Sequence, residues 1–136
     1  GGTGTANKLD DYEEGTFTAL VTTSEGGVVP LTTIKILSYT KIGRKVHIQG
    51  MIRLGTISSL SGAFFQINLP FTTASSSTID LYAGRGGGGI FYNDAGTISV
   101  VPFAFSESQT KFNVHKDSST LGTSDDLQIS FSYFTD

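Results

Sequence analysis

The sequence contains no cysteine, few charged residues and no long apolar run. Without cysteine, disulfides and thiolate-bound metals are excluded. Charged side chains make up 15% of the 136 residues, below the usual ~25%. No apolar run approaches the ~20 residues that a membrane helix requires, so membrane insertion is not expected. The net charge is −3 and the Lys and Arg residues are scattered, so the sequence lacks the basic stripe that nucleic-acid binding needs.

Hydroxyl side chains and glycine take the place of the missing charges. The chain has 16 Ser, 18 Thr and 17 Gly. This composition is typical of short strands joined by tight turns, with hydroxyls on the solvent faces. The length allows one domain with one core. Because the sequence does not begin with Met, we expect it to be a fragment of a longer protein.

Apolar and polar residues alternate with a period of two along much of the chain. In LQISFSY (127–133) the polar face is Gln128, Ser130 and Ser132, and in VHIQGMIRL (46–54) it is His47, Gln49, Met51 and Arg53. Further strands are expected over 16–22, 33–40, 63–69, 78–83, 89–93, 97–105 and 110–115. No segment keeps the 3.6-residue period of a helix over ten residues. About nine short strands predict an all-β fold, an antiparallel β-sandwich of jelly-roll type.

Two segments predict hairpin turns. KIGRK turns at Gly43, and YNDAG turns at Asn93 and Asp94, since both residue types tolerate left-handed backbone. Within 97–105, two adjacent valines precede Pro102, which predicts a change of face through a bulge or an edge position.

The stretch LDDYEEGTF (9–17) concentrates four carboxylates. Asp10 and Glu13 have capping-box spacing, and Gly15 can end a helix, so one helical turn over 11–14 is expected before a strand that starts at Thr16. On this interpretation the stretch is a joint between domains. Carboxylates for glycoside cleavage are one alternative. The other is a weak Ca²⁺ site formed by Asp10, Asp11, Glu13 and Glu14.

The run GRGGGG (84–89) formally contains GxGxxG, but the segment after it predicts a strand instead of the helix that nucleotide binding requires. We expect a flexible loop between two strands. An alternative is a loop thin enough for a glycan to lie against its backbone, with nearby aromatic faces and hydrogen-bonding groups. The candidate glycan-binding residues are then Arg85, Tyr82, Tyr92, Asn93 and Asp94.

Other catalytic or metal-binding patterns are weak. His47 and His115 lie on polar strand faces, where a solvated imidazole is ordinary, although copies of one histidine could meet on a threefold axis and bind a metal. No GxSxG elbow occurs. A glycosidase would have to draw its carboxylate pair from Asp80, Asp94 or Glu107. We expect no cofactor and no enzymatic activity.

Four segments together resemble a known family. ANKLDDYEEGTFTALV, YTKIGRKVHIQGMIRL, INLPF and the terminal ISFSYFTD resemble the C-terminal domain of bacteriophage tail fibre and tailspike proteins. That family has an LDDYEEGTWTP-like entry, a Y-x-K-x-G-x-x-V hairpin, an LPF segment and a closing strand. Phe17 and Ala19 depart from it, since Trp and Pro are common there. Residues 72–126 match no pattern of the family.

The resemblance implies a homotrimer at the far end of a fibre, extracellular on the virion. It would bind a host cell-surface polysaccharide or lipopolysaccharide without catalytic residues. Residues 1–15 would be a hinge from an upstream fibre or spike domain in the same chain, and residues 16–136 the β-sandwich tip. A purely structural trimerisation or folding cap is the alternative, and a polysaccharide-degrading enzyme is a less favoured one.

Overall fold

Strands make up most of the computed structural model, which describes residues 11–77 and 82–136. No α-helix occurs in these two ranges, and one 3-10 turn, η2 (Ser118–Thr120), lies close to the last strand. No helix within them is long and apolar enough to cross a membrane. The strands are β1 (Tyr12–Thr18), β2 (Val21–Thr23), β3 (Val28–Val29), β4 (Ile36–Ile42), β5 (Lys45–Arg53), β6 (Phe65–Asn68), β7 (Gly86–Asp94), β8 (Thr97–Phe105), β9 (Lys111–Val114) and β10 (Asp126–Phe134).

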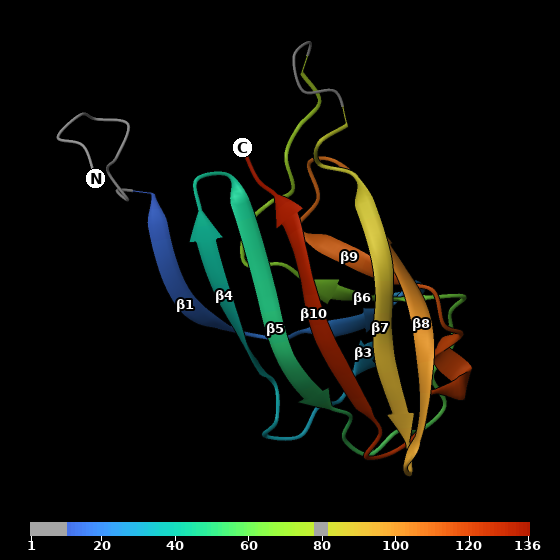
Figure 1. Cartoon of the computed structure of the whole chain (residues 1–136). Helices are drawn as coiled ribbons and strands as arrows, with labels where there is room; N and C mark the ends of the chain where they lie inside the picture. Colours follow the sequence, from blue (N-terminus) through green and yellow to red (C-terminus); the bar gives the residue numbers. More distant parts are fainter. Residues whose placement is uncertain (1–10, 78–81) are drawn as a thin grey trace, which may run out of the picture.

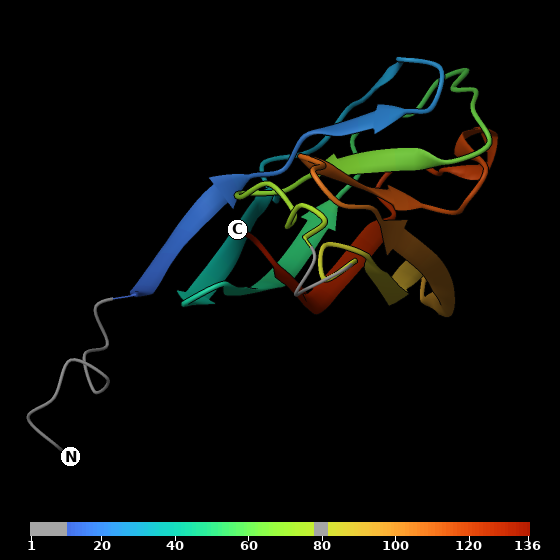
Figure 2. The ribbon, with the colours of Figure 1, turned by 90° about the horizontal axis from the view of Figure 1, so that it is seen from above.

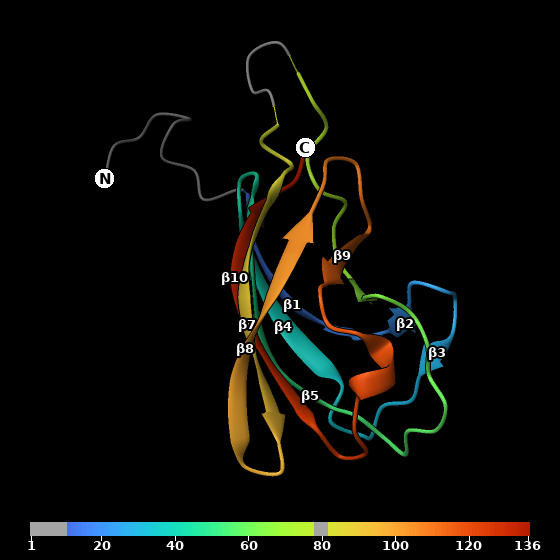
Figure 3. The ribbon, with the colours of Figure 1, turned by 90° about the vertical axis from the view of Figure 1, so that its right-hand side faces the viewer.

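All ten strands belong to one antiparallel sheet in the order β1-β4-β5-β10-β7-β8-β9-β6-β2-β3. The sheet curls into a half-barrel. Strands β1, β4, β5, β10, β7 and β8 form a long-strand layer, and β9, β6, β2 and β3 lie behind it as a short-strand layer (Figures 1 and 3). The all-β antiparallel prediction is confirmed. Hydrogen bonding is continuous from one layer to the other, because β8 pairs with β9 through Phe103↔Val114 and Ala104↔Asn113.

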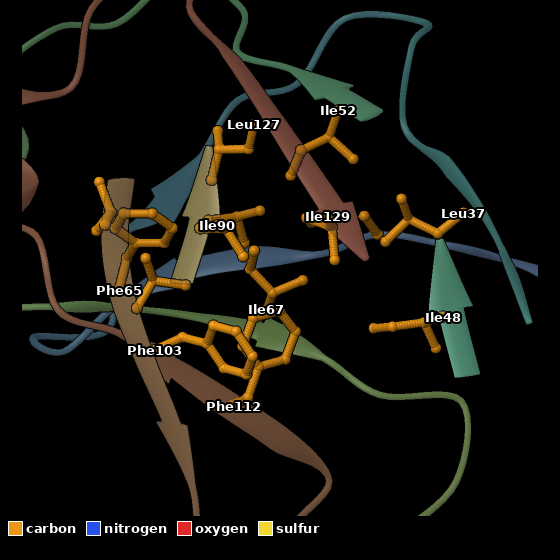
Figure 4. Close-up of a cluster of buried hydrophobic side chains, with 14 of the residues drawn as sticks. Leu37, Ile48, Ile52, Phe65, Ile67, Ile90, Phe103, Phe112, Leu127 and Ile129 are labelled. Carbon is orange, nitrogen blue, oxygen red and sulfur yellow. The ribbon is translucent and has the colours of Figure 1, made fainter. Parts of the chain in front are cut away.

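The predicted alternation of faces holds in the central strands. Leu127, Ile129 and Tyr133 of β10 are buried, whereas Gln128, Ser130 and Ser132 are exposed. Seen from above, the two layers face each other (Figure 2). Buried apolar residues of both layers form one core cluster. Aromatic residues from both layers meet there. The Phe103 ring centroid lies 5.5 Å from that of Phe112 and 4.4 Å from that of Phe131. Figure 4 shows Phe103 and Phe112 next to each other and beside Ile67 of β6.

The helical turn predicted over 11–14 is wrong, because Tyr12–Thr18 is strand β1. Gly15 lies directly opposite Tyr39 of β4, and a Cβ on Gly15 would lie 2.6 Å from the Tyr39 hydroxyl oxygen. The tyrosine therefore covers the glycine and donates a 2.7 Å hydrogen bond to Glu13. An aromatic packed over an edge glycine favours strand pairing, while a single helical turn has an unfavourable nucleation free energy. β1 thus begins inside the segment predicted as a hinge, and Asp10 lies outside the described residues.

Both predicted hairpin turns are present, but in the second one the left-handed residues differ from those predicted. Gly43 has φ +57° in the β4–β5 turn, as expected. In the β7–β8 turn the left-handed residues are Ala95 (φ +48°) and Gly96 (φ +96°). Asn93 and Asp94 instead end β7, and the Asn93 side-chain oxygen accepts a 2.8 Å hydrogen bond from the Gly96 amide. An amide side chain bonded to the backbone of a tight turn stabilises that turn.

A bulge or an edge position was predicted in 97–105, and the bulge is absent. The edge position is found, because among the described residues β8 pairs with β9 only at Phe103 and Ala104. Residues of β8 pair one to one with β7 from Thr97↔Asp94 to Phe105↔Gly86. The two adjacent valines suggested a change of face, but the alternation continues unchanged. Val100 faces outward and is exposed, whereas Val101 faces inward and is buried. Most of the strand predicted over 78–83 cannot be compared, because 78–81 lie outside the described residues. Its last two residues, Tyr82 and Ala83, are in a turn.

Candidate functional site

The face of the long-strand layer that points away from the core, here called the outer face, presents mixed polar and apolar rows. Directly opposed residues of antiparallel strands share a face. Gln49 of β5 pairs with Ser130 of β10, so both side chains point outward. Gln128 pairs with Met51 on one side and with Phe91 of β7 on the other. A polar row therefore lies beside a row with two large apolar side chains.

A groove opens on this face where β10 and β7 separate. The two strands pair only over Asp126–Gln128 and Phe91–Asn93, and then diverge (Figure 1). A hollow of about 470 Å³ lies at this divergence, and we call it the outer groove. It is lined by Gln49, Gly50, Met51, Gly89, Phe91, Gln128, Ile129 and Ser130.

The lining of the outer groove suits a neutral polar ligand with apolar faces. Gln49 and Gln128 each offer an amide donor and an amide acceptor, and Ser130 adds a hydroxyl. Phe91 has 51% of its surface exposed. Sugars combine hydroxyl groups with apolar ring faces, which match this set. None of the lining residues is ionisable, so the groove offers hydrogen bonding but no general acid or base of its own.

The glycine run beside the groove was predicted to be a flexible loop leading to a strand over 89–93, and the loop prediction is wrong for 86–88. Gly86 to Gly89 are the first part of β7. A Cβ on Gly87 would lie 2.5 Å from the Phe103 carbonyl oxygen, and one on Gly89 would lie 2.5 Å from Val100 Cγ1. Close packing of the β7–β8 hairpin therefore requires glycine there. At Gly89 the result is bare backbone in the groove wall.

Arg85 and Tyr82, two of the predicted glycan-binding residues, do lie together. The Arg85 guanidinium lies 5.1 Å from the centroid of the Tyr82 ring. It also forms an ion pair with Glu107, in which Arg85 Nη2 donates to Glu107 Oε1 at 3.2 Å. The guanidinium and the Ser76 hydroxyl lower the pKa of Glu107 to about 2. Arg85 thus has a protein carboxylate as its partner.

Tyr92, Asn93 and Asp94 are not part of the same site. Tyr92 is 3% exposed, and its hydroxyl donates to Asp125. The pKa of Tyr92 is raised, mainly by burial and in second place by the hydrogen bond to Asp125. Asn93 and Asp94 lie at the opposite end of β7 from Arg85, roughly 25 Å along the strand at ~3.3 Å per residue. The five predicted residues therefore occupy three separate places.

Tyr92 and Asp125 instead form an internal support for the loop before β10. The Asp125 carboxylate also accepts a 3.0 Å hydrogen bond from the Gly122 amide. Lys116 lies with its ammonium 4.5 Å from the Tyr92 ring centroid. Across the described parts of the chain, no buried side-chain nitrogen or oxygen lacks a hydrogen-bond partner. This buried pair is thus fully satisfied and holds the loop against the core.

The acidic residues at the N-terminal end do not form a common site. Glu13 and Glu14 are consecutive in β1, so their side chains point to opposite faces. Glu13 accepts a hydrogen bond from Tyr39, and Glu14 accepts one from Tyr12. Within 11–77 and 82–136, no three His, Asp or Glu side chains gather in a way that could hold a metal ion. Asp10 is outside these ranges.

The candidate histidines and catalytic carboxylates are also separated. His47 lies on the outer face of β5, whereas His115 follows β9 in the other layer. Asp94 ends β7 next to the hairpin turn, and Glu107 follows the far end of β8. The length of the hairpin, roughly 25 Å at ~3.3 Å per residue, far exceeds the ~5–9.5 Å of a glycosidase pair. Asp80 lies outside the described residues.

No protein-family model and no curated protein matches the chain. Alternation had already put Gln49, Gln128 and Ser130 on polar strand faces. Their convergence was missed because it depends on β10 pairing with both β5 and β7, which lie far apart in the sequence.

Proposed function

We propose that this chain is a non-enzymatic receptor-binding domain that holds a host cell-surface glycan in the outer groove. The supporting observation is the groove itself, in which Gln49, Gln128 and Ser130 surround the exposed ring of Phe91. Amides and hydroxyls beside an aromatic face bind sugar, and a lining without ionisable groups favours binding over bond cleavage.

We propose further that the domain is the tip of a bacteriophage tail fibre or tailspike, joined to an upstream domain and exposed on the virion. This rests on the resemblance of the segments between Ala6 and Tyr133. The curled sheet, with its two facing layers, would be a jelly-roll-like sandwich of such a tip. A single open groove would bind a polysaccharide or lipopolysaccharide weakly, in the ~mM range or about −4 kcal/mol. A homotrimer would present three grooves and raise the avidity.

An array of bacterial surface polysaccharides tests the proposal. The wild-type protein is compared with Gln128→Ala, which removes an amide from the groove, and with Gln109→Ala, which removes an exposed amide after β8. We expect binding by the wild type and the control, and loss of signal in Gln128→Ala. Light scattering on the same samples should give the mass of a trimer, and a stable monomer at micromolar concentration would remove the avidity argument.

A purely structural trimerisation cap is the second candidate, and the exposed apolar side chains favour it. Leu20 is 64% exposed and Val28 is 73% exposed at one edge of the sheet, and Val100 is 65% exposed on the outer face. Such side chains are commonly covered by a partner subunit. A trimer that binds nothing on the array would support the cap over the receptor-binding domain.

An enzyme is less favoured because the candidate carboxylates Asp94 and Glu107 are too far apart to act as a glycosidase pair. With its pKa lowered to about 2, Glu107 stays ionised near neutral pH and cannot serve as a general acid. A reducing-sugar assay on the polysaccharides bound by the array checks this. Release of new reducing ends by the purified domain would contradict the non-enzymatic proposal.

A further inference from the structure

We infer that the outer groove continues into a cationic subsite around Lys45 and His47, which accepts a carboxylate or phosphate substituent of the bound glycan. The inference rests on the proposed function and specifies the class of sugar. A second hollow of about 250 Å³ lies on the outer face. It is lined by Thr40, Ile42, Lys45, His47 and Ser132.

Strand register places the two hollows next to each other. Thr40, His47 and Ser132 form one row across β4, β5 and β10. The Gln49–Ser130 row of the outer groove is the next outward-facing row, two residues or roughly 7 Å along the strands. A chain of linked sugars could therefore occupy both hollows at once.

His47 connects the two rows. Its Nδ1 lies 2.9 Å from the Ser132 hydroxyl oxygen, and its Nε2 lies 3.5 Å from that of Ser130. The imidazole and the two hydroxyls thus form a polar strip that leads from the outer groove to Lys45. All three groups can donate hydrogen bonds to an oxyanion.

Lys45 carries a positive charge on the outer face, although the whole chain carries −3. Lys45 is exposed, and no carboxylate pairs with it in the part of the chain that the structure describes. Asp126, on the same face, is held by Arg53 at the other end of β5, with 2.6 Å between Arg53 Nε and Asp126 Oδ1. A charge-assisted hydrogen bond to Lys45 is therefore open to a ligand anion.

Two more carboxylates need to be considered. Asp136 follows Phe134, the β10 partner of Lys45, and accepts hydrogen bonds from Ser75. Glu14 lies in the same row as Thr40 but two strands away from β5, roughly 10 Å at the usual strand spacing. Its carboxylate accepts the hydroxyl hydrogen bond of Tyr12. At that distance its effect on an anion at Lys45 is largely screened at physiological salt.

The test uses an array with three groups of bacterial polysaccharides, whose repeat units carry uronate, phosphate or no charge. Wild type, Lys45→Gln and Lys111→Gln are compared. Lys111 is an exposed lysine of β9 in the short-strand layer, so its substitution changes the net charge equally without touching the outer face. We expect stronger binding of the charged groups by wild type. Lys45→Gln should weaken that binding roughly threefold to tenfold and leave neutral glycans unaffected.

The outcomes separate the two proposals. Binding of uronate but not phosphate repeats, or the reverse, identifies the anion and supports the subsite. Wild-type binding of neutral glycans alone, or equal losses in Lys45→Gln and Lys111→Gln, would overturn the subsite and leave the outer groove intact. Silence of the wild type on all three groups would overturn the receptor-binding proposal itself.

Discussion

Gln49 of β5 and Ser130 of β10 are direct partners in the sheet, and both side chains line the outer groove. Strand pairing alone brings them together, since neither the β4–β5 hairpin nor the β7–β8 hairpin contains both. The groove exists because β10 keeps its pairing with β5 over nine residues but leaves β7 after three. Glycan binding is thus proposed at a defect in the regular pairing of the sheet.

Phe91→Ala should weaken glycan binding by about 1 kcal/mol, or roughly fivefold, because the sugar loses its aromatic face. Unfolding should change little, since half of the ring is exposed. Calorimetric titration with a glycan selected on the array measures the affinity. Val100→Ala is the matched control, because Val100 is the exposed β8 partner of Phe91 but does not line the groove. Equal losses in both variants would argue against the groove.

Tyr92→Phe should lower the free energy of unfolding by about 1–3 kcal/mol. The substitution removes the hydroxyl that donates to Asp125 and leaves a buried carboxylate with fewer donors. Urea denaturation measures the difference. Tyr82→Phe should be nearly neutral, because Tyr82 is exposed. A Tyr92 variant as stable as the Tyr82 variant would show that the buried hydrogen bond is not stabilising.

Stability should fall as the pH rises above about 10. Burial raises the pKa of Tyr92 and of Tyr133 above the ordinary value of 10.0. The unfolded chain therefore loses these protons first, and the stabilisation, complete below pH 10, decreases as the pH approaches the folded-state pKa. Each tyrosine contributes a slope of up to about 1.4 kcal/mol per pH unit. Urea titrations at several alkaline pH values should give a smaller slope for Tyr133→Phe, and an unchanged slope would refute the assignment.

Arg85→Gln should raise the pKa of Glu107 from about 2 toward the ordinary 4.5. In the wild type the stabilisation from this ionised carboxylate is present above pH 4.5 and is lost as the pH falls toward 2. NMR titration of the carboxyl carbon follows the change directly. Arg53→Gln serves as the control, since Arg53 pairs with Asp126 instead. A Glu107 pKa that does not move in Arg85→Gln would mean that the ion pair is not formed in solution.

Gly87→Ala should destabilise the fold more than Gly88→Ala. The new Cβ at Gly87 meets the Phe103 carbonyl oxygen at 2.5 Å, and that backbone atom cannot move without disturbing the hairpin. The new Cβ at Gly88 meets the edge of the Phe103 ring at 3.2 Å, a contact that a displacement of a few tenths of an ångström would relieve. We expect a loss of about 1–3 kcal/mol for Gly87→Ala. Equal melting temperatures for the two variants would contradict the packing explanation of the glycine run.

The strands and their faces could be predicted because the period-two pattern is a local signal. The range 97–105 matches β8, and the polar face of 127–133 is the outward face of β10. The segment around Gly15 shows where a local signal misleads. Its capping-box spacing favours a helical turn, but pairing with Tyr39 from a distant hairpin makes it a strand.

The candidate site could be predicted only in part. The glycine run was predicted as a possible glycan-binding loop, and it lies in β7, which does line the groove. Its glycines serve close packing, however, and among them only Gly89 lines the groove. Tyr92 is of a residue type that often binds sugar, yet its position in the alternating pattern of β7 places it in the core. The polar residues of the groove become a site only once the partners of β10 are known, and single-strand patterns do not specify partners.

A crystal structure of the oligomer soaked with host glycan fragments would show where the sugar binds. We expect a sugar ring against Phe91, with its hydroxyls bonded to Gln49 and Gln128. Sugar bound instead at the Arg85 end of β7, or an outer groove filled by a neighbouring subunit, would contradict it.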